Sequence, residues 1–161
     1  TAGIQMYFTT SKPLVDRGLV LDLQGTMATL DGERAIRDPV VREIGSPVVI
    51  KPTFLTSRAL GGGDLGYPAW TVGQRGITGA SGLNNIGLLV KITGAFGYVD
   101  SGTFTVDDGG GAPVKCIAPE MVPNPAWRYV TVTGISSCEV VGSELRRLLR
   151  VRSASDIVVL L

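Results

Sequence analysis

The chain has no histidine, and only 18% of its 161 residues are charged. Without histidine it lacks the side chain that most often acts as a general base near neutral pH, and also the commonest ligand of transition metals. Its two cysteines are too few for a structural zinc site. Its longest apolar runs, such as residues 157–161, are far shorter than a membrane-spanning helix. We therefore expect a protein that is not an enzyme, with no catalytic, cofactor-binding or metal-binding residues and no cofactor.

The few charges are evenly balanced along the chain. The net charge is +1, with six residues of each sign in residues 1–57 and seven of each sign in residues 88–161. A general polyanion binder would carry a basic excess, so nucleic acid is not the favoured partner. A mean hydropathy of +0.27 indicates a surface that is unusually apolar or covered by neighbours. This composition favours a homo-oligomer or homopolymer.

One short stretch matches a nucleotide-binding pattern. Residues 61–66, GGGDLG, fit G-x-G-x-x-G. In dinucleotide-binding proteins a strand precedes this loop and a helix follows it, with an acidic residue about 20 positions further on. Here the following residues contain too many helix breakers for a helix, and the next acidic residue is Asp100. We interpret the stretch as a turn-rich connector.

Short β-branched runs between 22 glycines and nine prolines predict an all-β fold. Residues 145, 148 and 149 share one helical face, so residues 144–151 could also form a helix; a sequence repeat favours a strand. In the second half the expected strands are residues 88–98, 103–107, 113–118, 129–139 and 145–152.

The two halves of the chain resemble copies of one β unit. In both, an alternating apolar run leads to a glycine (Gly25 and Gly134), then to a turn with Gly and Glu, then to a strand with arginine. The second half has the five strands of an OB-type Greek-key barrel, whereas the first begins at the third strand. We predict two OB-like units in tandem: an incomplete unit at 1–57, a Gly-rich connector at 58–87 and a complete barrel at 88–161. The first is completed by the second half or by a neighbouring strand.

Four segments carry a resemblance to a known repeat: KPTFLTSRALGGG, SGLNNIGLLVKITGAFGYVDSGTFTVDDGGG, VTVTGISSCE and RLLRVRSASDIVVL. They are similar to an OB-type β-barrel repeat of uncharacterised, predicted secreted or cell-surface proteins of environmental bacteria. The resemblance implies an extracellular or cell-surface location, which a chain that begins at Thr1 would reach after removal of a signal peptide. It supplies no catalytic residues.

Cys116 and Cys138 have the strand parity of their apolar neighbours, so both are expected to face inward. Two such cysteines fit either a disulfide or two buried thiols. The extracytoplasmic setting that the resemblance implies favours the disulfide.

The only basic cluster lies on the last barrel strand and comprises Arg146, Arg147, Arg150 and Arg152. Together with aromatic side chains it could bind single-stranded nucleic acid or an acidic polysaccharide, although pairing with acidic residues on the neighbouring strand is the simpler interpretation. The candidate aromatics are Phe96, Tyr98, Phe104, Trp127 and Tyr129.

The leading functional hypothesis is an extracellular structural protein, a β-rich subunit that self-assembles into a filament or surface polymer. Two terminal strands could be exchanged with a neighbour: an N-terminal one containing Ile4, Met6 and Phe8, and a C-terminal one containing Ile157 and Val159. The alternative is an OB-fold binding module for nucleic acid or glycan.

Overall fold

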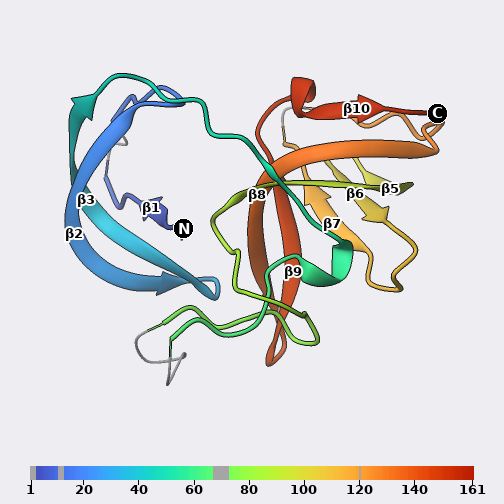
Figure 1. Ribbon diagram of the computed structural model, residues 1–161, viewed down its shortest axis with the longest axis horizontal. Coiled ribbons are helices and arrows are strands. Elements are labelled where there is room, and N and C mark those ends of the chain that lie inside the picture. Colours follow the sequence, from blue (N-terminus) through green and yellow to red (C-terminus); the bar gives the residue numbers. More distant parts are fainter. Residues whose placement is uncertain (1–2, 11–12, 67–72, 120) are drawn as a thin grey trace.

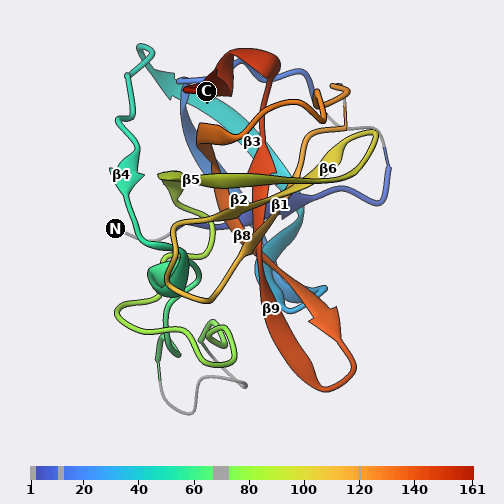
Figure 2. The ribbon, with the colours of Figure 1, turned by 90° about the vertical axis from the view of Figure 1, so that its right-hand side faces the viewer.

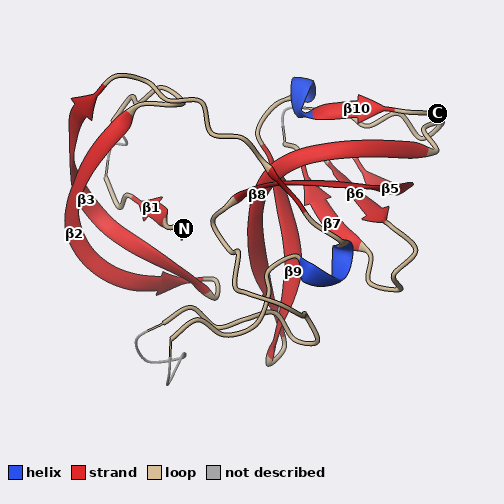
Figure 3. Cartoon of the chain, viewed as in Figure 1, coloured by secondary structure: helices blue, strands red, loops and turns tan. Residues whose placement is uncertain are grey.

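The computed structural model describes residues 3–10, 13–66, 73–119 and 121–161 of the chain. It is all-β, as predicted, with one three-stranded and one seven-stranded sheet (Figures 1 and 3). The only helical segments in the described ranges are two short 3₁₀ turns, Ser57–Ala59 and Ala154–Asp156. The prediction of tandem barrel-like units is confirmed at this level.

The second half of the chain forms a closed barrel. Its strands are β5 (Leu89–Asp100), β6 (Thr103–Asp107), β7 (Val114–Ile117), β8 (Tyr129–Val141) and β9 (Glu144–Val151). They are hydrogen-bonded in the order β5-β6-β7-β9-β8, and β8 pairs with β5 to close the ring. The β7–β9 pair is parallel and the other pairs are antiparallel. This is the strand order of an OB-type barrel, and the segment also considered as a helix is strand β9.

Alternating apolar residues fill the barrel. Its core is lined by side chains such as Val90, Phe104, Cys116, Val130 and Leu149, all fully buried. Two short strands flank the ring: β4 (Thr53–Phe54) pairs with β5, and β10 (Ile157–Val159) pairs with β8. Because β10 and β4 lie at the two ends of the seven-stranded sheet, each has one edge without a strand partner among the described residues.

The first sheet contains β1 (Gln5–Tyr7), β2 (Val20–Leu30) and β3 (Glu33–Gly45) in the order β1-β3-β2. The long β2–β3 hairpin curves away from the barrel at one end of the molecule (Figure 1). Its tight turn uses Asp31 and Gly32, both with positive φ, as a two-residue hairpin turn requires. In the view turned by 90°, the β8–β9 hairpin extends past the barrel (Figure 2).

The connector between the sheets is mainly loop, as the glycine content predicts. Between Leu60 and Gly87 the described part contains one isolated bridge, Leu65 with Gln74. Leu60 itself is fully buried and belongs to the barrel core. The connector therefore also covers one end of the barrel.

Candidate functional site

The three-stranded sheet has the pairing pattern of part of the barrel. The parallel β1–β3 pair corresponds to the parallel β7–β9 pair, and the antiparallel β2–β3 pair corresponds to β8–β9. Strands β1, β2 and β3 thus hold the third, fourth and fifth positions of a barrel. Among the described residues nothing occupies the first two positions, which β5 and β6 fill in the second unit.

Gly25 and Gly134 mark the same point in the two units. A Cβ on Gly25 would lie 2.6 Å from Cγ2 of Ile36 and 3.0 Å from the carbonyl oxygen of Arg37. A Cβ on Gly134 would lie 2.7 Å from the carbonyl oxygen of Arg150. In both strands, therefore, glycine allows close contact with the neighbouring strand of the hairpin.

Aligning the two glycines shows what the incomplete unit exposes. Leu21 and Leu23 of β2 correspond to Val130 and Val132 of β8. The two valines, which β5 pairs with and covers, are fully buried, whereas the two leucines are only half-buried. The missing strands thus leave apolar side chains partly open to solvent.

Both edges of the first sheet also lack a strand partner in the described part of the chain, namely the outer edges of β1 and β2. Large apolar side chains on this sheet are exposed, including Met27 at 49%, Val40 at 68% and Ile44 at 60%. An open edge beside exposed apolar surface is the usual template for pairing with another chain. This open first unit, residues 5–45, is the candidate functional site.

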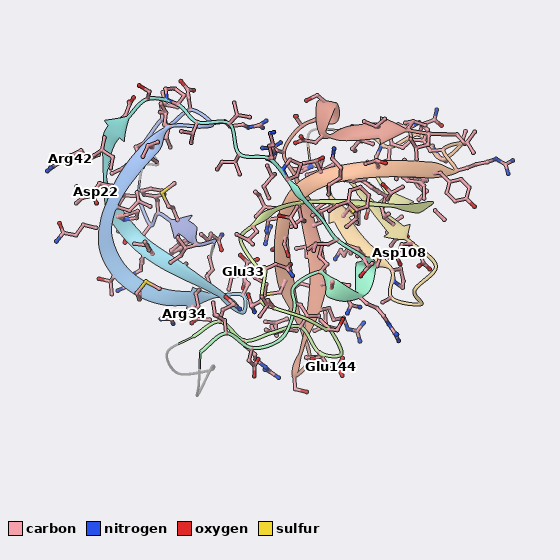
Figure 4. The ribbon with its side chains drawn as sticks, in the orientation of Figure 1. Asp22, Glu33, Arg34, Arg42, Asp108 and Glu144 are labelled. Carbon is pink, nitrogen blue, oxygen red and sulfur yellow. The ribbon has the colours of Figure 1, made fainter. Side chains whose placement is uncertain are left out.

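A buried glutamate holds the open unit against the barrel. Glu33, at the start of β3, is 5% exposed, and its Oε1 accepts hydrogen bonds from the Ser137 hydroxyl and, at 3.0 Å, from the Cys138 amide. Nε of Arg150 donates to Oγ of Ser137 at 2.9 Å. Ser137 thus connects a carboxylate from the first unit with a guanidinium from the second. Glu33 is labelled in Figure 4, between the first sheet and the barrel.

Further contacts join the units at two other places. The side chain of Gln74 in the connector accepts from the amide of Arg34 at 2.7 Å and donates to the carbonyl of Gly32 at 2.8 Å. At the opposite end of the β2–β3 hairpin, Arg17 donates to the carbonyl of Arg152 at 2.8 Å. The hairpin is therefore anchored near both of its ends.

The segments expected to exchange with a neighbour are paired within the chain. Met6 lies in β1, which pairs with β3; Ile4 and Phe8 flank that strand. Ile157 and Val159 lie in β10, which pairs with β8 opposite Val132 and Val130. Neither segment is a free strand, but both lie at the edge of a sheet.

The predicted disulfide between Cys116 and Cys138 is not formed, and both residues are free thiols. Cys116 packs in the barrel core, whereas Cys138 packs in a second cluster with Ile77, Ile86 and Leu145. Burial, together with the charge of the Glu33 carboxylate, raises the pKa of Cys138 to about 12. Burial also raises the pKa of Cys116 far above its usual range. Equal strand parity had placed both cysteines inside, but it could not distinguish one core from two adjacent clusters.

The four arginines do not form one basic surface. Arg152 makes a two-pronged ion pair with Asp156, and Arg146 lies 3.6 Å from Glu144. Arg150 contacts Ser137 at the junction between the units. Nε of Arg147 is buried without a hydrogen-bond partner, and burial, with the nearby charge of Arg58, lowers its pKa. Arg146, Arg150 and Arg152 have the same strand parity, and it is their separate contacts with Glu144, Ser137 and Asp156 that divide the cluster.

A polar groove of about 410 Å³ runs over the barrel wall and includes Lys115, Arg146 and Arg147, together with Glu139 and Glu144. Lys115 and Glu139 form an ion pair of 2.8 Å across the groove. The groove is therefore of mixed charge, not cationic.

Most of the candidate aromatic side chains are engaged in packing. Phe104 is fully buried, and Phe96 contacts both Phe104 and Trp127, with ring centroids 5.4 and 5.3 Å away. Tyr98 and Tyr129 are exposed, at 46% and 47%. Of the five candidate aromatic residues, Tyr98 and Tyr129 are therefore the two that are exposed enough for a base or sugar to stack on.

Several backbone groups of the glycine-rich loop form hydrogen bonds within the protein. The Gly61 amide donates to Oδ1 of Asn85, the Gly63 amide to the carbonyl of Gly82, and the Gly62 carbonyl accepts from Ile77. These groups therefore do not form a phosphate cradle. Elsewhere, Asp108 accepts from the amides of Ser57 and Gly110, and the Ser57 bond is the main cause of its lowered pKa.

A scan of protein-family models found no match to the chain, and searches of curated proteins and of solved structures also found none. Within the described ranges, no helix has the length and apolar character needed to cross a membrane. Nor do those ranges bring three or more acidic or cysteine side chains together in a metal-binding arrangement.

Proposed function

We propose that the protein is a structural subunit that self-associates by completing its open first unit with strands of another copy. The observation that carries the proposal is the contrast between Leu21 and Leu23, half-buried, and Val130 and Val132, fully buried at the corresponding positions of the second unit. The same fold position is closed in one unit and open in the other.

Pairing at this site has two physical sources of stability. Added strands would satisfy the backbone groups along the open edges, as in other cases of β-augmentation. They would also remove apolar side chains from water, at roughly 25 cal/mol for each Å² covered. Only 18% of the residues are charged, which reduces the electrostatic repulsion that normally keeps such edges apart.

The proposal places the assembly outside the cell or on its surface and assigns it no catalytic step. The resemblance to secreted repeats supports this location. The apolar surface supports a subunit whose neighbours are copies of itself. Fractionation of the native source, with detection by antibody, tests the location. Detection confined to the cytoplasmic fraction would contradict it.

Self-association is tested with the full chain by analytical ultracentrifugation over a wide concentration range and by negative-stain electron microscopy. We expect oligomers whose size increases with concentration. Leu23→Glu, which introduces a charge on the open face, should raise the concentration needed for assembly, whereas Leu14→Glu, at a fully exposed position, should not. A monodisperse monomer at high concentration would overturn the proposal.

The alternative, a binding module for single-stranded nucleic acid or acidic glycan, is favoured by one observation. Arg147 has a buried Nε without a partner, lies near Arg58 and lines the groove on the barrel wall. Binding of this kind would weaken with salt. Titration with labelled oligonucleotides and with an acidic polysaccharide at low salt, comparing the wild type with Arg147→Ala, tests it. If no binding occurs at low salt, this alternative is excluded.

A further inference from the structure

The last residues of the chain form an apolar sheet edge. Strand β10 and the residues after it, 157–161, carry no charge, and Val158 is 54%, Leu160 49% and Leu161 74% exposed. The ladder continues beyond β10, because Leu160 donates to the Tyr129 carbonyl and the Leu161 carbonyl accepts from Arg128. No proline, lysine or bulge protects this edge.

This edge and the open first unit lie at opposite ends of the molecule. Figure 1, which has the longest axis horizontal, shows the β2–β3 hairpin at one end and β10 with the C-terminus at the other. A contact that joins these two ends uses different surfaces on the two copies. Such a contact is heterologous, and unless the rotation between copies closes a ring it extends into a filament.

We propose that β10 of a second copy pairs antiparallel with the free edge of β2 at residues 20–26. This inference rests on the proposed self-association and specifies its donor strand and its acceptor strand. The second unit provides the template, because β5 pairs antiparallel with residues 129–135 of β8, which align with residues 20–26 through the equivalence of Gly134 and Gly25.

The direction of the strands agrees with this template. In the barrel, β5 and β6 are antiparallel and occupy the first and second positions. In the proposed contact β10 of the second copy occupies the first position, and its own antiparallel partner β8 follows on the outer side. No strand has to leave its own molecule, so the contact extends a sheet without exchange.

The alternation of side chains sets which residues share a face. Ile157 and Val159 lie opposite the buried Val132 and Val130, so they point to the core side of their sheet, and Val158 points to the other side. On β2, Asp22 lies opposite Arg42 on the outer face of the hairpin (Figure 4).

In the proposed pairing, the apolar face of the donor strand lies on the same side as the apolar face of the acceptor strand. In the register that sets Val158 opposite Gln24, Val159 lies opposite Leu23, Leu161 opposite Leu21 and Ile157 opposite Gly25. The apolar side of the donor thereby covers the two leucines that remain half-buried in the isolated chain.

The size of the contact predicts a modest affinity for each joint. Five residues of ladder extend about 17 Å, and a specific interface needs about 1,200 Å² of buried surface in total. The ladder needs the surrounding apolar side chains, including Tyr129 and Leu161, to approach that area. We therefore expect assembly that depends strongly on concentration.

Val158→Lys tests the donor strand, with Val140→Lys as its control, since both valines are 54% exposed and Val140 lies at the far end of β8. A lysine at 158 should raise the concentration at which the full chain assembles at least about tenfold, and a lysine at 140 should leave it near the wild-type value. If Val158→Lys assembles like the wild type while the wild type polymerises, the donor assignment is wrong and the proposed self-association stands. If the wild type does not assemble, both are wrong.

Cross-linking tests the register without a destabilising charge. Oxidation of the Gln24→Cys/Val158→Cys variant should give a ladder of covalent multimers, because the two native cysteines are buried and free. The Gln24→Cys/Val140→Cys variant should remain monomeric under the same oxidant. Equal cross-linking of the two variants, or none in either at concentrations where the chain assembles, would overturn the proposed pairing.

Discussion

The contact between Glu33 and the barrel gives the sharpest test of how the two units are held together. Glu33→Ala removes the acceptor for two buried donors, the Ser137 hydroxyl and the Cys138 amide. A buried donor left without a partner costs about 1–3 kcal/mol. Relief from burying a carboxylate offsets part of this loss. We expect the free energy of unfolding to fall by about 3 kcal/mol, and the melting temperature by roughly 6–12 °C for a chain of this length.

The second unit offers a matched control. Glu144 begins β9 as Glu33 begins β3, but its side chain is 50% exposed. Its carboxylate makes one long ion pair, 3.6 Å, with the guanidinium of Arg146. Glu144→Ala should therefore change the stability by less than about 0.5 kcal/mol. Glu33→Gln keeps an acceptor oxygen for the two donors and should therefore lose less stability than Glu33→Ala. It should still be less stable than the wild type, since hydrogen bonds to a neutral group are weaker than those to a charged one.

Urea unfolding at a concentration where each variant is monomeric, followed by tryptophan fluorescence and far-ultraviolet circular dichroism, measures these differences. If Glu33→Ala were within 0.5 kcal/mol of the wild type, the hydrogen bonds of Glu33 would not be what fixes the first unit. Two separate transitions in the wild type would also contradict the reasoning, because they would show that the units unfold independently.

Three further outcomes are expected. Gly134→Ala should destabilise the barrel by about 2 kcal/mol or more in thermal unfolding, because its Cβ would lie 2.7 Å from the Arg150 carbonyl oxygen and 2.8 Å from Cγ of the fully buried Leu149. Cys116 and Cys138 should react with a thiol reagent at pH 8 only after denaturant is added, because their raised pKa values keep them protonated. Asp108→Asn should lower stability at pH 7 and flatten its decline below about pH 4: a depressed carboxyl pKa stabilises above the unfolded value and is lost as pH falls through the folded one.

The strands of the barrel could be predicted from the sequence, but the contacts that hold the first unit against the barrel could not. Alternation of apolar residues located both ends of every strand from β5 to β9 to within two residues, since each strand has one face in a single core. The repeat around Gly25 and Gly134 indicated the missing first two strands. The pairing of β1 with β3 could not be read in the same way, because three residues carry too little periodicity.

Glu33 was not predicted, and the reason is physical. Its position repeats that of Glu144, and local sequence does not distinguish a glutamate buried at a junction from one in solvent. One signal was present: Glu33 alternates with Ala35, and both prove to be buried on the same side of β3. The arginines and cysteines show the same limit, because their partners depend on how the two units meet.

Because the β2–β3 hairpin is anchored near both ends, neither end can move freely away from the barrel. Its turn is fixed through Glu33 and Gln74, and its other end is fixed through Arg17. An edge strand held in this way has little freedom left to lose when another strand binds, so more of the contact energy appears as affinity. It also means that a pull along a chain of copies would act on the hydrogen bonds of Glu33 with Ser137 and of Arg17 with Arg152 before it stretched the connector between the units.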